Sequence, residues 1–251
     1  MITIKNQNDI AAMRIAGRIT KQALNLVGQH VRPGITTKEL DKIAYDYIRS
    51  QGAVPSFLNY NGFPASICAS RNDEVVHGIP SKKTVLQDGD IISIYVGAYK
   101  GGFHGDCAKT FFVGQVSEEA QKLVAATRQS FYEGMKYAKA GNRIGDISSA
   151  IQSYIESMGY SIVRDLVGHG IGSHMHEDPS VPNFGRPGRG PRLVPGMALA
   201  IEPMVNAGNF EVRVMDDDWT VKTLDGSLSA HYENTILITG GEPEILTVAD
   251  E

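Results

Sequence analysis

Four residues with metal-binding side chains stand in otherwise apolar, strand-like segments of this sequence. They are Asp106 in GFHGD, His169 in VGHGIG, Glu202 in ALAIEPM and Glu233 in AHYENTILIT. A buried carboxylate is costly unless it is paired or bound to a cation. Each residue alone is also explained as a turn cap, a strand edge or a salt-bridge partner. Together, three carboxylates and one imidazole from different predicted strands indicate a catalytic site for Mn, Fe(II) or Co(II), with Zn as a further option.

Asp106 lies on the second strand of a predicted β-hairpin. Two apolar runs, 91–99 and 103–112, flank a glycine turn at 100–102, which is typical of a hairpin. A two-residue loop formed by the first two turn residues would place Tyr95 directly opposite Asp106. We therefore expect the two side chains to face each other across the hairpin.

The glycine-rich segment 168–179, GHGIGSHMHEDP, is the densest chemical signal in the chain. It is no dinucleotide fingerprint, because the third glycine and a following helical pattern are both missing. It is no zincin helix either, because Ser180 stands where the second histidine would be. We expect its glycines to let the backbone approach a bound group, and His176 to donate hydrogen bonds to an oxyanion. His174 is expected to be an exposed loop residue.

The composition limits the possible classes of protein. The chain has 251 residues, 42% hydrophobic and 21% charged, with a net charge of −4, which is ordinary for a soluble globular protein. This net negative charge does not indicate nucleic-acid binding, and no apolar run approaches the length of a membrane span. Cys68 and Cys107 make no disulfide framework, and the N-terminus does not resemble a secretory signal. We expect a cytoplasmic protein without membrane partners or nucleic-acid sequence readout.

Helix signals occur twice, at a constant offset. Capping residues and glycine stops predict helices over about 6–30, 36–52, 117–140 and 147–159. An offset of 107 places five residues of the first half on identical residues of the second: Gly34 on Gly141, Tyr47 on Tyr154, Ile48 on Ile155, Ser50 on Ser157 and Gly52 on Gly159. The pattern predicts a twofold internal repeat.

The rest of the second half reads as strands. Apolar runs separated by turns predict strands at 161–167, 197–205, 211–214, 219–222 and 231–239. We expect an α+β fold in which helices lie outside a curved, mostly antiparallel sheet. The expected organisation is a single domain over 1–251, with repeat halves of about 1–113 and 114–251.

Five motifs give the chain a resemblance to a known family. They are VVHGIP (75–80), GFHGD (102–106), GHGIG with the following HE (168–177), IEPMVN (201–206), and DWTVKT with HYENT (218–235). Over nearly its whole length the chain resembles type I methionine aminopeptidases of the short bacterial form, which have the pita-bread fold. We do not expect the extra N-terminal domain of the related creatinases and prolidases, and this disfavours a proline-directed peptidase.

The resemblance implies roles for particular residues. Asp106, His169, Glu202 and Glu233 would bind one or two divalent metal ions, with Asp106 and Glu233 bridging the two. His77 and His176 would hold the substrate and stabilise the tetrahedral intermediate, and Glu202 would carry the proton. The implied methionine pocket consists of Phe57, Tyr60, Phe63, Cys68, His77, Met175, Trp219 and His231. The implied substrates are N-terminal methionyl peptides and nascent polypeptides with a small second residue; the ribosome exit region is a further expected partner, and a monomer the expected form.

The sequence departs from this family at Tyr95, where the resemblance calls for a metal-binding aspartate. A tyrosine with an ordinary pKa is a poor ligand. We therefore expect a weakened second metal position and a site that is mononuclear at ordinary metal levels. His231 is expected to line the pocket, with replacement of the lost ligand as the less favoured alternative. The competing hypothesis for the whole chain is a catalytically impaired pita-bread module that binds peptides or a partner.

Overall fold

Capping side chains begin the first two helices where the sequence predicts them. In the computed structural model, which describes residues 1–249, α1 (Gln7–His30) follows Asn6, whose side chain accepts hydrogen bonds from two backbone N–H groups of the first turn. α2 (Thr37–Ser50) follows Thr36, which forms the predicted capping box with Glu39. These caps satisfy N–H groups that the first helical turn leaves without partners.

The second helix pair is α3 (Glu118–Met135) and α4 (Ile144–Ser157). The bounds of α4 lie 107 residues after those of α2. The prediction that α3 continues to about residue 140 is wrong. After Met135 the chain tightens into turns in which Tyr137 N–H donates to Gly134 and Ala138 N–H donates to Met135. These short-range hydrogen bonds replace the next helical turn.

Backbone hydrogen bonds repeat at the same offset. Gly34 N–H donates to the carbonyl of Leu86 at 2.8 Å, and Gly141 N–H donates to the carbonyl of Leu193 at 3.0 Å. Both pairs of residues are related by the offset of 107. The loops that lead into α2 and α4 therefore have the same local geometry, which is the structural form of the predicted repeat.

Fourteen strands follow from the alternation of apolar runs and turns in residues 1–249. They are β1 (Val54–Pro55), β2 (Ile67–Arg71), β3 (Glu74–Val76), β4 (Ile91–Lys100), β5 (Phe103–Phe112), β6 (Ser161–Ile162), β7 (Gly168–Gly170), β8 (Glu177–Val181), β9 (Ala198–Ile201), β10 (Met204–Asn206), β11 (Val212–Val214), β12 (Val221–Thr223), β13 (Ser229–Leu237) and β14 (Glu244–Ile245). The predicted strand at 161–167 is wrong beyond Ile162. The one predicted at 197–205 is interrupted at Glu202-Pro203, where proline has no N–H to donate.

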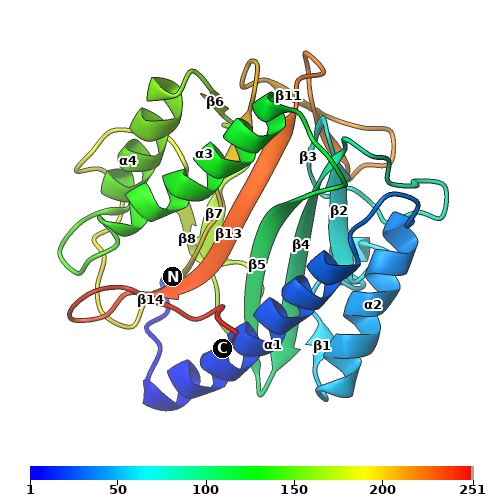
Figure 1. The fold of residues 1–251 in the computed structure, drawn as a ribbon. Coiled ribbons are helices and arrows are strands. Elements are labelled where there is room, and N and C mark those ends of the chain that lie inside the picture. Colours follow the sequence, from blue (N-terminus) through cyan, green and yellow to red (C-terminus); the bar gives the residue numbers. More distant parts are fainter. Residues whose placement is uncertain (250–251) are drawn as a thin grey trace.

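The large sheet has the order β1-β4-β5-β13-β9-β7-β8, and a smaller sheet has the order β11-β12-β3. The central pairings, β4 with β5, β5 with β13 and β13 with β9, are antiparallel. Figure 1 shows α1 and α2 in blue beside β4 and β5, and α3 and α4 in green along the other half, where α3 packs on β13. This is the predicted arrangement of helix pairs outside a curved antiparallel sheet.

The hairpin register differs from the prediction by one turn residue. The loop is Gly101-Gly102, so Lys100 pairs with Phe103, Gly97 faces Asp106 and Tyr95 faces Ala108. Both loop glycines have positive φ, 63° and 90°. A two-residue hairpin turn of this kind needs positive φ at both central positions, which lysine does not readily adopt. The turn therefore centres on the glycine pair, and Tyr95 is a diagonal neighbour of Asp106.

Two apolar clusters lie between the helix pairs and the sheet. Leu24, Leu40 and Ile94 are fully buried in the first cluster, under α1 and α2. Phe131 and Ile151 are fully buried in the second, under α3 and α4. This packing fixes the sheet whose inner face carries the polar residues described next. In residues 1–249, no helix combines the length and the apolar character needed to cross a membrane.

Candidate metal centre and substrate cavity

Strand pairing brings the four predicted ligands to one face of the sheet. Glu233 on β13 pairs with Ala108 on β5, and Asp106 is two residues further along β5, hence on the same face. Thr235 on β13 pairs with Ala200 on β9, which in turn pairs with His169 on β7. Glu202 follows directly after β9.

The ligand atoms of these residues lie close together. His169 Nε2 is 3.3 Å from Asp106 Oδ2 and 3.5 Å from Glu202 Oε1. One ligand atom each from Asp106, His169 and Glu233 lies within 4.8 Å of the others, and all three residues are buried. His169 Nδ1 lies 2.8 Å from the carbonyl of Gly170. Because a carbonyl only accepts, Nδ1 carries a proton. In the neutral ring Nε2 therefore has a lone pair, close to Asp106 and Glu202, that can bind a metal ion.

Several polar atoms of this cluster lack hydrogen-bond partners. Among the described residues, His169 Nε2 and both carboxylate oxygens of Glu233 are buried and make no hydrogen bond. Glu233 is 0% exposed. Buried carboxylate oxygens without partners destabilise the folded state, and a cation bound between them removes this destabilisation. The donor set and its orphaned atoms therefore fit a divalent metal ion.

The protonation states reflect the crowding of buried carboxylates. Burial raises the pKa of Glu202 to about 8, and the neighbouring Asp106 adds to the shift. Burial and the charges of Asp106 and Glu202 raise the pKa of Glu233 well above its ordinary value. Burial would lower the pKa of His169, but the carboxylates of Asp106 and Glu202 outweigh it and raise the pKa to about 9. Without a cation, the cluster therefore holds protons near neutral pH.

Asp106 is held by two hydroxyl groups. The Thr235 hydroxyl donates to Oδ1 at 2.7 Å and the Tyr95 hydroxyl donates to Oδ2 at 3.0 Å. Burial alone would raise the pKa of Asp106, but His169 and these two hydroxyls hold it below its ordinary value. Burial and the charge of Asp106 raise the pKa of Tyr95. Tyr95 thus retains its proton and acts as a hydrogen-bond donor to Asp106.

His231 lies in the cluster rather than in the cavity wall. Its Nε2 is 3.7 Å from Glu202 Oε2 and 3.7 Å from Glu233 Oε2. The residue is 1% exposed, and its ring meets the Tyr95 ring edge-on at a centroid distance of 5.4 Å. Burial lowers the pKa of His231 to about 3, so its imidazole is neutral.

A cavity of about 210 Å³ adjoins the cluster. Its walls are Phe57, Tyr60, Asn61, Phe63, Cys68, His77, Tyr95, His176 and Trp219. Six of the eight residues predicted for the pocket line it. Met175 is buried in the same apolar cluster as the wall residues Phe57 and Phe63 but does not line the cavity. His231 lies among the carboxylates. Asn61 also lines the cavity, but the sequence indicates only a turn-forming residue there and not a pocket residue.

His77 and His176 both face this cavity. Burial lowers the pKa of each to about 4, so both rings are neutral at pH 7. His176 Nδ1 lies 2.7 Å from the hydroxyl of Tyr60, and its ring centroid is 4.2 Å from that of His169. His176 therefore stands between the cavity and the cluster.

Two glycines of segment 168–179 allow close packing between strands. A Cβ on Gly168 would lie 2.3 Å from the carbonyl oxygen of Ala200, and one on Gly170 would lie 2.2 Å from that of Asp178. These glycines allow β7 to approach the backbone of its neighbours on both sides. The expectation that the glycines also let the backbone approach a bound group stays a prediction. His174 has an 82% exposed side chain, as expected for a loop residue.

A buried ion pair positions the segment that carries His176, and no local sequence pattern indicates this pair. Lys5 Nζ is 2.6 Å from Glu177 Oε2, and both side chains are buried. The other Glu177 oxygen accepts the backbone N–H of His174 at 3.1 Å. Thr235 was missed as well, although its spacing of two from Glu233 on one strand places both on the same face.

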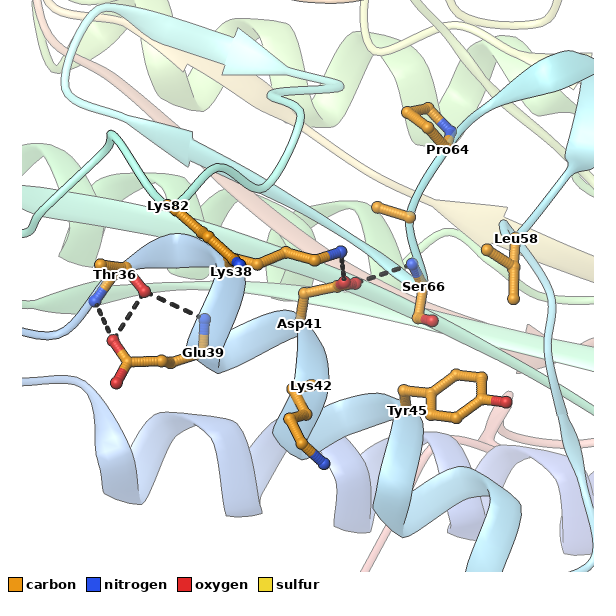
Figure 2. A pocket seen from close by; sticks show the side chains of 11 residues that line it. Thr36, Lys38, Glu39, Asp41, Lys42, Tyr45, Leu58, Pro64, Ser66 and Lys82 are labelled. Carbon is orange, nitrogen blue, oxygen red and sulfur yellow. Dashed lines mark hydrogen bonds and ion pairs between the residues drawn. The ribbon is translucent and has the colours of Figure 1, made fainter.

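A larger cavity, of about 700 Å³, lies outside this site. Figure 2 shows it between α2 and the loop before β2, where Lys38, Asp41 and Ser66 lie together. Asp41 accepts the backbone N–H of Ser66 at 2.7 Å and that of Ile67 at 3.3 Å, and pairs with Lys38 at 2.7 Å. Asp41 thereby fixes the chain between Phe63 and Cys68, whose side chains line the smaller cavity.

Comparison with known proteins agrees with this architecture. The profile of metallopeptidase family M24 matches residues 11–240. The chain is 57% identical to a methionine aminopeptidase of Clostridium acetobutylicum over 100% of both chains, and 52% identical to methionine aminopeptidase 1 of Bacillus subtilis over 98% and 99%. A crystal structure of methionine aminopeptidase from Thermotoga maritima superposes with a TM-score of 0.97 at 44% identity, covering 98% and 99%. The fold and the buried cluster define a pita-bread metallopeptidase. The chain belongs to family M24, and within it to the bacterial type I methionine aminopeptidases.

Proposed function

We propose that this chain removes the N-terminal methionine from peptides and nascent polypeptides whose second residue is small. The observation that carries the proposal is the buried cluster of Asp106, His169, Glu202 and Glu233 at the edge of an aromatic cavity. The chain belongs to the methionine aminopeptidases, which also supports an N-terminal methionine as the substrate residue.

We propose these four residues as the ligands of the primary metal ion. Three carboxylates and one imidazole suit Mn(II), Fe(II) or Co(II), with Zn(II) as a further option and one or two ions per chain. When bound, such an ion lowers the pKa of a water molecule and polarises the substrate carbonyl. The hydrogen bonds from Thr235 and Tyr95 fix the Asp106 carboxylate, as partners of metal ligands commonly do.

Glu202 is the proposed proton carrier. It takes a proton from the attacking water and returns it to the leaving amine, a role that is most effective when the pKa of the group lies near the working pH. Its position between His169 and His231, 3.5 Å and 3.7 Å away, supports this role.

His176 and His77 are the proposed substrate-holding residues. When the Tyr60 hydroxyl donates to Nδ1 of His176, the ring proton sits on Nε2 and is available to the carbonyl oxygen as negative charge develops there. His77 faces the same cavity, edge-on to Trp219 at a centroid distance of 6.3 Å. Both rings are neutral, so they donate hydrogen bonds without adding charge to the cavity.

The methionine side chain would occupy the aromatic cavity. Phe57, Phe63 and Trp219 line it, and thioether sulfur makes favourable contacts with aromatic rings.

The proposed setting is the cytoplasm, with a monomer as the working form and nascent chains at the ribosome exit region as a source of substrate. Cys68 and Cys107 are free and buried, which fits a reducing compartment. Cosedimentation with ribosomes and size-exclusion chromatography test the partner and the monomer.

Methionine release from the tripeptide Met-Ala-Ser tests the function. The chelator-treated protein should be inactive, and Mn(II), Co(II) or Fe(II) should restore release. Leu-Ala-Ser is the matched substrate control and should be cleaved at least tenfold more slowly. A folded protein that releases no methionine with any of the three metals would instead support the peptide-binding module.

A further inference from the structure

The second imidazole of the cluster, His231, has the features of a metal ligand. One ligand atom each from Glu202, His231 and Glu233 lies within 4.8 Å of the others, and all three side chains are buried. Among the described residues, neither ring nitrogen of His231 and neither carboxylate oxygen of Glu233 makes a hydrogen bond. Buried polar atoms without hydrogen-bond partners destabilise the fold unless a bound group satisfies them.

The spacing of these atoms suits a cation. His231 Nε2 is 3.7 Å from Glu202 Oε2 and 3.7 Å from Glu233 Oε2. Two donors that each lie about 2.1 Å from a tetrahedral metal are about 3.4 Å apart. Small side-chain adjustments therefore bring all three donors to bonding distance of one ion.

The group of Glu202, His231 and Glu233 overlaps the primary ligand set in its two glutamates and differs from it in the imidazole. Glu202 reaches His169 with Oε1 at 3.5 Å and His231 with Oε2 at 3.7 Å, and Glu233 belongs to both groups. We propose that His231, Glu202 and Glu233 bind a second divalent cation beside the one held by Asp106 and His169. The inference rests on the proposed function, because it completes the metal site of the same reaction.

The alternative ligand on this side is Tyr95, and its contacts disfavour it. The Tyr95 hydroxyl already donates to Asp106 Oδ2 at 3.0 Å, so its oxygen would have to give up both a proton and this hydrogen bond. Its ring meets the His231 ring edge-on and thereby holds the imidazole in place. Tyr95 thus acts as a positioning residue for Asp106 and His231.

The second position would take the same class of metal as the first. One imidazole nitrogen and two carboxylates suit Mn(II), Fe(II), Co(II) or Zn(II). Both carboxylates are shared with the primary ion, so the second ion should bind more weakly. This differs from the sequence-based expectation, in which His231 lines the pocket and the second metal position is weakened.

Metal binding without substrate tests the proposal. Calorimetric titration of the metal-free protein with Co(II) should show two ions for the parent. The variant His231→Leu should bind the first ion within about threefold of the parental affinity and the second at least 100-fold more weakly. The matched control is His104→Leu, since His104 is half-buried, contacts Ser56 and belongs to neither ligand group; it should keep both ions. A His231→Leu protein that binds two ions with parental affinities would overturn the proposal, as would a parent that binds one ion at millimolar Co(II).

A second measurement on the unmodified sequence covers the case in which a variant fails to fold. In protein labelled with ¹⁵N-histidine, Zn(II) should shift the Nε2 resonance of His169 first and that of His231 at the second equivalent. An Nε2 resonance of His231 that does not move through millimolar Zn(II) would refute ligation. Two bound ions without methionine release would count against the proposed function alone, so the two failures are distinguishable.

Discussion

Replacing Glu202 by glutamine should change how the stability of the metal-free protein depends on pH. Glu202 is 6% exposed, and burial raises its pKa from an ordinary 4.5 to about 8. Between these pH values the folded protein keeps a proton that the unfolded chain releases. The free energy of unfolding of the parent therefore falls as pH rises, by about 1.4 kcal/mol per pH unit from this group.

Glutamine has nearly the same shape and does not ionise. Relative to the parent, Glu202→Gln should therefore gain stability as pH rises, by on the order of 4 kcal/mol between pH 4.5 and 8. Below pH 4.5 the difference should be constant, because Glu202 is protonated in both states. The low pKa values of His77 and His176, about 4, affect parent and variant alike and cancel in the comparison.

Urea unfolding followed by far-UV circular dichroism, with chelator present, measures this difference at pH 5, 6, 7 and 8. Addition of saturating Mn(II) should reverse the order at pH 8, because the cation replaces the proton in the parent cluster and stabilises only the state that binds it. A stability difference that stays constant from pH 5 to 8 would contradict the raised pKa of Glu202, since it would mean that Glu202 ionises in the folded protein as easily as in the unfolded chain.

Three further predictions concern residues that are buried near the site or pack around it. Asp41→Ala should lower the free energy of unfolding by about 2–4 kcal/mol in urea, because two buried backbone N–H groups lose their acceptor. Gly168→Ala should cost about 3 kcal/mol in the same assay, since its Cβ would lie 2.3 Å from a β9 carbonyl oxygen. The thiols should resist alkylation at pH 8 until the protein unfolds, because burial raises the pKa of Cys68 and raises that of Cys107 to about 12, which leaves a thiolate fraction on the order of 10⁻⁴.

Matched variants separate these effects from general sensitivity to mutation. Lys38→Ala removes the half-exposed partner of Asp41 and should cost less than about 1 kcal/mol. Gly240→Ala adds a Cβ with no atom within 4 Å and should be nearly neutral. Equal losses in each pair would contradict the assigned contacts, and rapid alkylation of the native protein would contradict the burial of the thiols.

The helices were predictable because their signals are local. Asn6 and Thr36 cap helices through contacts within three residues, and the offset of 107 relates whole segments of the sequence. The end of α3 was not predictable in the same way, because a sequence of good helix formers continues past Met135 while the backbone turns away to meet the following loop.

The candidate ligands could be found from the sequence because carboxylates are rare on apolar strands. Their mutual geometry could not. One residue in the placement of a glycine turn decides whether Tyr95 faces Asp106 or Ala108. The position of His231 depends on the pairing of β13 with β5, more than 120 residues apart, and the Lys5–Glu177 pair joins the N-terminal segment to the segment that carries His176. These contacts depend on the assembled sheet rather than on any local pattern.

The catalytic role of the buried cluster is tested most simply by methionine release from Met-Ala-Ser by the Mn(II)-loaded parent and by Glu202→Gln, with folding of both verified by circular dichroism. The parent should release methionine, and the variant should be at least 100-fold slower, because it lacks the proposed proton carrier and a charged metal ligand. A folded Glu202→Gln protein that releases methionine at the parental rate would contradict the central claim that this buried cluster performs the reaction.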